Sequence, residues 1–211
     1  MQGNSAKRIY SAAVALIAWF AVIIQLVLII QNRVTGVPET LIRFFSFFTI
    51  LTNIVVAAYL TGVAFQKQDK AGWQRSSTAT AIAVYILVVG FVYNAVLRQL
   101  WAPVGMQKLV DELLHVVVPL LYFVYWVKFV SPVLLPWRKA ITWLLYPLVY
   151  LVFVLIRGSV SNYYPYPFLD AFNHGYEKVM ISSAAMLLLF LLLSVAFIAG
   201  SRYLARKKVT V

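Results

Sequence analysis

Residues 180–200 read MISSAAMLLLFLLLSVAFIAG, an apolar run without a single charged side chain. At about 1.5 Å per residue, a helix of this length crosses a hydrocarbon core about 30 Å thick. Inside lipid the backbone N–H and C=O groups have no water to bond, so such a run must satisfy them internally as a helix. The stretch therefore predicts a membrane-spanning helix.

Five further apolar runs precede this one, at residues 9–30, 41–65, 78–100, 113–130 and 140–156. The fourth and fifth runs are near the lower limit of length for a span. The connections between the runs are short, and no low-complexity tract divides the chain. The sequence predicts an all-α bundle of six transmembrane helices that forms a single domain, residues 1–211.

The composition agrees with a chain that is surrounded by lipid. Hydrophobic residues make up 63% of the 211 residues and charged residues 11%, whereas a soluble domain is about half apolar and about a quarter charged. The net charge of +12 would suggest nucleic-acid binding in a soluble chain. Here the basic tail lacks interleaved aromatic residues, so we expect no nucleic-acid partner. The absence of cysteine excludes disulfides and thiolate metal sites.

The basic residues are distributed unequally between the two sides of the predicted bundle. Twice as many fall on the side of the termini and the second and fourth loops as on the other side. The larger group is Lys7, Arg8, Lys67, Lys70, Arg75, Lys128, Arg138, Lys139, Arg202, Arg206, Lys207 and Lys208. The positive-inside rule places this side in the cytoplasm. We expect a multi-pass protein of the inner (cytoplasmic) membrane with both termini in the cytoplasm.

Several predicted spans carry polar side chains, which are costly in a membrane and therefore mark candidate functional sites. In the second run, four polar residues share one helical arc of about 120°. The polar residues of the second, third and fourth runs are Ser46, Thr49, Thr52 and Asn53, then Asn94 and Arg98, then Lys108, Asp111, His115 and Tyr122. With the predicted topology they all lie at a similar depth in the outer half of the membrane, which predicts a site there.

The residue types at this depth fit acyl transfer. His115 has an imidazole that can act as a base near neutral pH. Without cysteine, the candidate nucleophiles are hydroxyls, and Thr49 matches His115 in depth better than Thr52 does. Asp111 precedes His115 by one helical turn and can orient the imidazole.

Other polar groups can support such a reaction. Asn53, Asn94 and Arg157 are candidate hydrogen-bond donors to an oxyanion, and Asp170 is a candidate supporting residue. A hydroxyl–histidine pair that opens into lipid implies an amphiphilic ester substrate drawn from membrane lipids. The reaction requires no cofactor, and the sequence does not fix the oligomeric state.

Two other interpretations remain open. Asp111-x-x-x-His115 and Asp170-x-x-x-His174 have the same carboxylate–imidazole spacing, and together they predict a metal site with nitrogen and oxygen ligands. In the other interpretation the same polar layer binds a solute, and the chain is a transporter or a small-molecule-binding membrane protein without chemistry.

Four short motifs carry a family resemblance: FTILTN at 48–53, DELLH at 111–115 followed by Pro119, Arg157-Gly158, and YPFLD at 166–170. In this order they resemble the bacterial Pr6Pr membrane proteins. They are more distantly similar to the androgen-induced membrane hydrolases of animals, which cleave fatty acid esters of hydroxy fatty acids. The resemblance implies a membrane-embedded threonine nucleophile with a histidine partner. The histidine corresponds to His115, and the threonine to Thr49 or, in a shifted register, to Thr52.

Overall fold

The computed structural model describes residues 2–65 and 76–209, and within these ranges the chain is helical and has no strand. Six helices are long and apolar enough to cross a membrane. They are Ser5–Gln31, Phe48–Phe65, Ser76–Leu100, Gly105–Phe129, Lys139–Ser161 and Ala171–Lys207. The predicted all-α, six-helix membrane fold is confirmed, and the chain is a multi-pass membrane protein. Lys67, Lys70 and Arg75, which support the predicted topology, lie outside the described residues.

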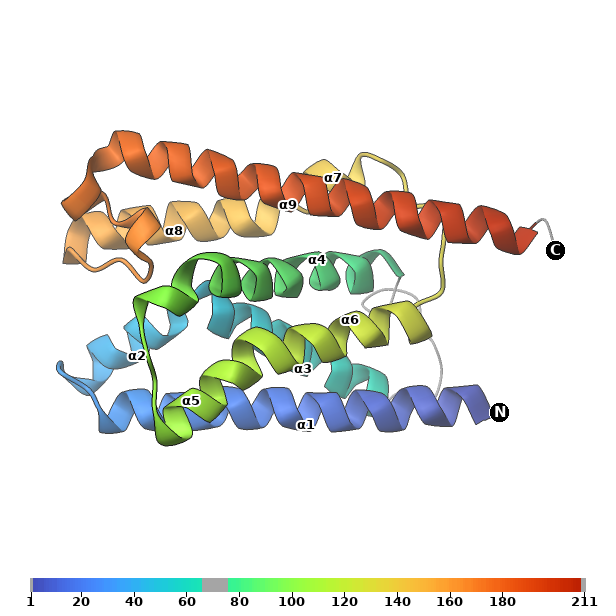
Figure 1. The fold of residues 1–211 in the computed structure, drawn as a ribbon, viewed down its shortest axis with the longest axis horizontal. Helices are drawn as coiled ribbons and strands as arrows, with labels where there is room; N and C mark the ends of the chain where they lie inside the picture. Colours follow the sequence, from blue (N-terminus) through green and yellow to red (C-terminus); the bar gives the residue numbers. More distant parts are fainter. Residues whose placement is uncertain (1, 66–75, 210–211) are drawn as a thin grey trace. The chain divides into compact units, whose positions relative to one another are not determined.

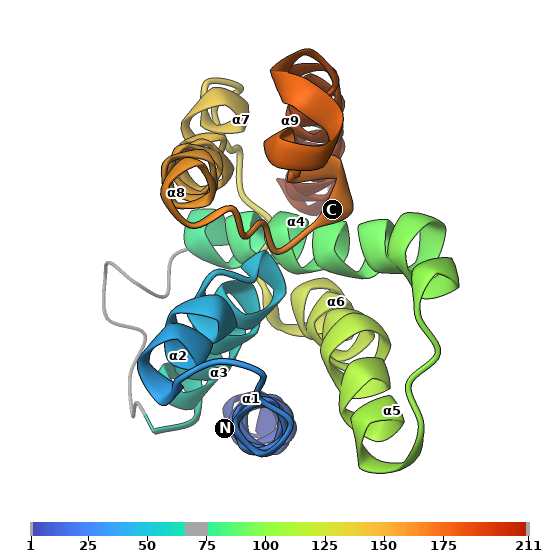
Figure 2. The same ribbon diagram turned by 90° about the vertical axis from the view of Figure 1, so that its left-hand side faces the viewer.

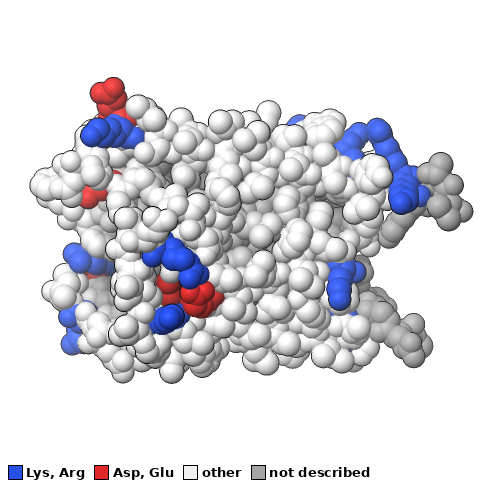
Figure 3. Space-filling model, viewed as in Figure 1, with Lys and Arg blue, Asp and Glu red and all other residues white. Residues whose placement is uncertain are grey.

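On the face drawn in Figure 3, most charged side chains lie toward the ends of the helices, and one group of basic and acidic side chains is set farther in. A broad part of this face is uncharged, as the hydrocarbon core of a membrane requires.

The chain divides into two compact units, Met1–Ser131 and Pro132–Val211. The first unit is built on four long helices, α1 (Gln2–Gln31), α3 (Phe48–Phe65), α4 (Ser76–Val92) and α6 (Val118–Phe129). Each of them packs against two others: α1 against α3, α3 against α4, α4 against α6, and α6 against α1 (Figures 1 and 2). The first four predicted spans therefore form a closed four-helix ring.

The most extensive of these contacts joins α1 to α3. The buried face of α1 carries small residues, including Ser11, Ala15, Ala18 and Ala21. Small side chains at a helix interface let two backbones approach closely in a membrane, where lipid supplies no hydrophobic force between helices. Leu16, on another face of α1, is 71% exposed and is available to lipid.

The second predicted run is wrong as a single helix. The structure has α2 (Val37–Phe45), a break, and then α3 from Phe48. Ser46 lies in the break, where its hydroxyl donates to the Ile42 carbonyl at 2.7 Å and its N–H bonds the Arg43 carbonyl at 3.0 Å. These bonds satisfy the last carbonyls of α2 and end the helix. Ser46 therefore does not share a helix with Thr49, and the predicted four-residue arc is broken.

Two π-helical turns interrupt the third and fourth spans. In the third span α4 continues into η1 (Tyr93–Leu97, π-helix) and η2 (Arg98–Leu100, 3-10 helix). In the fourth span α5 (Gly105–Glu112) continues into η3 (Leu113–Val117, π-helix) and then α6. The fourth span begins at Gly105 rather than at the predicted residue 113, so Asp111 lies inside it. The sequence prediction missed this beginning because residues 105–112 are too polar to be recognised as part of an apolar run.

The second unit contains α7 (Lys139–Thr142), α8 (Leu145–Ser161), η4 (Pro167–Leu169) and α9 (Ala171–Val209). The helix α9 packs against each of the other three elements, and Gly175, with φ of 78°, interrupts it near its start. Near its other end, the Ser201 hydroxyl bonds both the N–H and the carbonyl of Val133, at 3.1 and 2.9 Å. These two bonds hold the segment before α7 against α9.

Candidate functional site

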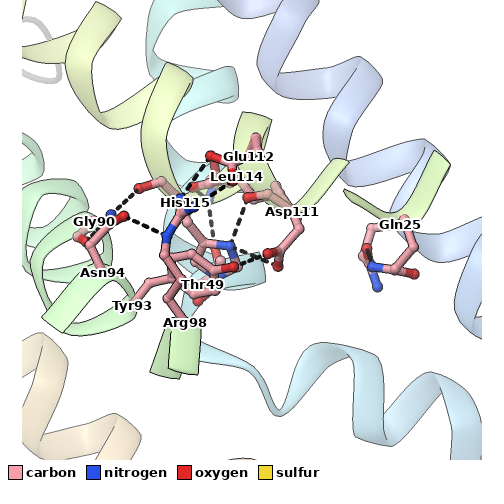
Figure 4. Close-up of polar contacts among 12 residues, drawn as sticks. Gln25, Thr49, Gly90, Tyr93, Asn94, Arg98, Asp111, Glu112, Leu114 and His115 are labelled. Atoms are coloured by element: carbon pink, nitrogen blue, oxygen red, sulfur yellow. Dashed lines mark hydrogen bonds and ion pairs between the residues drawn. The ribbon is translucent and has the colours of Figure 1, made fainter. Parts of the chain in front are cut away.

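The most concentrated polar cluster of the first unit surrounds His115 on the π-turn η3 (Figure 4). Its Nδ1 lies 2.9 Å from the main-chain oxygen of Asp111 and 3.2 Å from Asp111 Oδ1. The two side chains are only 13% and 7% exposed. The predicted pairing of Asp111 with His115 is therefore present.

The surroundings of the imidazole favour one tautomer. Both oxygens near Nδ1 are acceptors, which favours placing the ring hydrogen on Nδ1. Among the described residues, no group forms a hydrogen bond with Nε2 of His115. The lone pair of Nε2 is then available to accept a proton, as a general base requires.

Tyr93, the first residue of η1, belongs to this cluster but is not among the site residues predicted from the sequence. Its hydroxyl donates to Asp111 Oδ2, and its ring stacks on the imidazole of His115 with centroids 4.0 Å apart and planes 16° apart. The indole of Trp101 also lies near the Asp111 carboxylate. Tyrosine and tryptophan are common near membrane interfaces, so no sequence pattern distinguishes these two from the other aromatic residues.

An ion pair lies next to this cluster and links the third and fourth spans. Arg98 binds Glu112 through two hydrogen bonds of 2.7 and 2.8 Å, and its Nε donates to Asn94 Oδ1 at 2.9 Å. The guanidinium carbon also lies 5.1 Å from the centre of the Tyr93 ring. An exposed pair of this kind adds little stability, but its geometry fixes the two interrupted helices against each other.

The π turn and Pro119 together explain why Asn53 is buried at this place. The N–H of Val118 bonds the Leu113 carbonyl, and Pro119 has no N–H. The Leu114 carbonyl therefore lacks the main-chain donors that would normally reach it. Asn53, which is fully buried, donates from Nδ2 to that carbonyl at 3.2 Å and to the Thr49 carbonyl at 2.9 Å.

Asn94 has a corresponding position on the facing helix. Its Nδ2 donates to the Gly90 carbonyl at 2.7 Å and lies 3.5 Å from the His115 carbonyl, which Pro119 also leaves without its usual donor. In this structure the N–H groups of both candidate oxyanion donors, Asn53 and Asn94, thus face main-chain carbonyls. The Oδ1 atom of Asn53 is buried and accepts no hydrogen bond from the described residues.

The two candidate nucleophiles lie on the first turns of α3. Thr49 is 7% exposed and Thr52 is fully buried. One amide nitrogen, that of Asn53, bonds the carbonyls of both Thr49 and Leu114, so the backbone at Thr49 lies beside the residue that precedes His115. Through this shared donor, the backbone of Thr49 is tied to the histidine segment.

Replacing Asn53 with Leu is expected to destabilise the protein by about 1–3 kcal/mol, because two buried carbonyls lose their side-chain donor. Thermal unfolding in detergent measures the change. The matched control is Asn32→Leu: the Asn32 amide also donates to a carbonyl, that of Leu28 at 2.9 Å, but at an exposed helix end. We expect this control to change stability by less than about 0.5 kcal/mol. Equal effects of the two variants would contradict a specific role for Asn53.

Three further predicted residues, Arg157, Asp170 and His174, lie in the second unit. Arg157 donates to the Tyr163 carbonyl at 3.0 Å, and its guanidinium carbon lies 4.6 Å from the centre of the Tyr163 ring. The side chain of His174 is exposed, and its main-chain N–H bonds the Asp170 carbonyl at 3.0 Å.

Asp170 is bound at the start of α9. Its carboxylate accepts hydrogen bonds from the N–H of Asn173 at 3.0 Å and from Asn173 Nδ2 at 2.7 Å. Desolvation raises the pKa of Asp170, but hydrogen bonds from Asn173 and from the backbone of Phe172, together with the nearby His174, bring that pKa below its usual range. Within residues 2–65 and 76–209, no three His, Cys, Asp or Glu side chains gather into a group that could hold a metal ion.

Comparisons with family models, curated proteins and solved structures found no match to this chain. The resemblance to the Pr6Pr proteins therefore stays a prediction that rests on the four short motifs.

Proposed function

We propose that this protein is an integral membrane hydrolase of lipid-like esters, of the fatty acid ester of hydroxy fatty acid type. His115 is its general base, and Thr49 is its nucleophile, with Thr52 as the alternative. One observation carries the proposal: a largely buried imidazole inside a membrane span has Nδ1 paired with Asp111, and no described residue forms a hydrogen bond with its Nε2. The predicted topology places this site in the outer half of the bilayer.

In the proposed first half-reaction, Nε2 of His115 removes the proton of the Thr49 hydroxyl while the oxygen attacks the ester carbonyl. The tetrahedral intermediate collapses, and the leaving alcohol takes the proton from the imidazolium. A water molecule, activated by the same Nε2, then attacks the acyl-threonine. This second step releases the fatty acid and restores the threonine hydroxyl.

Asp111 has a defined part in both steps. Its main-chain oxygen bonds Nδ1 and its carboxylate oxygen Oδ1 lies 3.2 Å from the same atom, so Asp111 holds the ring in the tautomer that accepts a proton at Nε2 and stabilises the imidazolium that forms. In a site shielded from water this charge stabilisation is stronger than it would be in solution.

The surroundings of the site suit a substrate with acyl chains. Phe91, on α4, is 59% exposed, and Leu120, on α6, is 56% exposed. In a membrane these apolar side chains face lipid, and they flank the π turns that carry Tyr93 and His115. A lipid-like ester can reach the site sideways from the bilayer without leaving its apolar surroundings.

Fluorophosphonate labelling of the purified protein in detergent tests the activated hydroxyl. We expect the wild type to be labelled, and the variants Thr49→Ala and His115→Ala to lose labelling, because the probe reacts with a hydroxyl that has an adjacent base. Thr52→Ala is the control and keeps its label. Loss in Thr52→Ala alone would assign the nucleophile to Thr52. No labelling of folded wild-type protein would contradict the hydrolase and favour a binding or transport role.

A further inference from the structure

We infer that Tyr93 is a positioning residue of this site, which fixes the Asp111 carboxylate and the plane of the His115 imidazole. The inference rests on the proposed function, because it assigns Tyr93 a part in presenting the general base. Tyr93 acts on the reaction only through these two side chains.

Tyr93 orients the Asp111 carboxylate through a hydrogen bond. One carboxylate oxygen, Oδ1, lies 3.2 Å from Nδ1 of His115, and the other, Oδ2, accepts from the Tyr93 hydroxyl. With the Tyr93 hydroxyl donating to one oxygen and the imidazole beside the other, the carboxylate has one preferred orientation. Because the Asp111 side chain is only 7% exposed, water does not readily replace a lost donor.

Tyr93 also orients the imidazole of His115, because the two rings are stacked. The Tyr93 ring lies nearly parallel to the imidazole, and this contact limits rotation of the histidine ring. The Tyr93 ring is itself held in place, since the Arg98 guanidinium lies over it and Glu112 binds that guanidinium. The same side chain therefore constrains both members of the Asp111–His115 pair.

Other tyrosine hydroxyls of the first unit bond different partners from that of Tyr93. The hydroxyls of Tyr10 and Tyr122 donate to main-chain carbonyls, those of Leu121 and Ala79, at 2.9 and 3.2 Å. Such bonds satisfy a polar atom and leave the site untouched. The Tyr93 hydroxyl instead bonds the carboxylate that orients the proposed base.

The variant Tyr93→Phe separates the hydroxyl from the ring. We expect kcat for ester hydrolysis to fall on the order of 10- to 100-fold, since a hydrogen bond to a charged group is lost. KM is expected to stay within about 3-fold, because uniform substrate binding is unchanged. Tyr10→Phe is the matched control, as it removes another hydroxyl of the same unit that bonds a main-chain carbonyl, and its kcat is expected to stay near that of the wild type.

A spectroscopic readout tests the inference without activity. In ¹⁵N-histidine NMR spectra, with His115 assigned by its loss in His115→Gln, we expect the wild-type imidazole to carry its hydrogen on Nδ1. In Tyr93→Phe the shifts are expected to move toward a mixture of tautomers. Unchanged shifts in Tyr93→Phe would overturn the positioning role, whatever happens to kcat. A wild type that hydrolyses no ester but shows the shift change would instead refute the proposed function alone.

Discussion

Replacing His115 with Gln is expected to lower the rate of ester hydrolysis by about 10²- to 10⁴-fold, the usual contribution of a general base. Glutamine keeps a polar group of similar reach in this largely buried place, but it cannot take up a proton near neutral pH. The measurement is kcat/KM on a fatty acid ester of a hydroxy fatty acid in detergent micelles. The circular dichroism spectrum of the variant establishes that its helices are intact.

The same substitution at the other histidine is the matched control. His174 is exposed on α9, and its replacement by Gln is expected to change the rate less than about 3-fold. A comparable loss in both variants, together with inhibition by a chelator, would contradict the threonine mechanism.

The second large effect is expected at Gly90, where α4 approaches the histidine segment. A β-carbon added there would lie 3.1 Å from the His115 carbonyl oxygen and 3.2 Å from Pro119 Cβ. A main-chain carbonyl and a proline ring cannot rotate away, so the two helices must separate. Gly90→Val is expected to destabilise the protein by about 1–3 kcal/mol and to reduce activity with it. Thermal unfolding and hydrolysis of the same preparation measure both effects.

Gly200 supplies the control for this substitution. It also lies in a membrane-spanning helix, α9, but a β-carbon there meets nothing within 4 Å. Gly200→Val is expected to leave unfolding and hydrolysis close to wild type. If both glycine variants were equally unstable, the cause would be valine in a helix rather than the close approach at Gly90.

Hydropathy was sufficient to find all six spans, because the lipid environment constrains the backbone so strongly. It failed at boundaries where a polar residue interacts with its own helix. Ser46 ends α2 by bonding carbonyls of the preceding turn, although the apolar run continues past it. Asp111 lies well inside a span because Tyr93 and His115 satisfy its carboxylate, although a charge usually marks the end of an apolar run.

The sequence revealed only those parts of the site that depend on local spacing. Asp111 and His115 were paired correctly, since residues four apart share one helical face. Tyr93 was missed because its contact with them crosses between two spans, and nothing local encodes that contact. Asn53 and Asn94 were noticed as costly polar groups, but their partners follow from the π turn and Pro119 together. Periodicity at 3.6 residues per turn cannot predict a π turn.

The π turn at Leu113–Val117 has a genetic consequence. It holds one residue more per turn than the α-helix on either side, so an in-frame deletion of a single codon there would restore a regular α-helix. Because the wider turn accommodates that extra residue, the helix on either side would keep nearly the same orientation after the deletion. The turn that presents the Leu114 carbonyl to Asn53 would be gone, while the span would keep its hydropathy. Loss of one codon can thus remove a buried contact of the site and leave a protein that still inserts into the membrane.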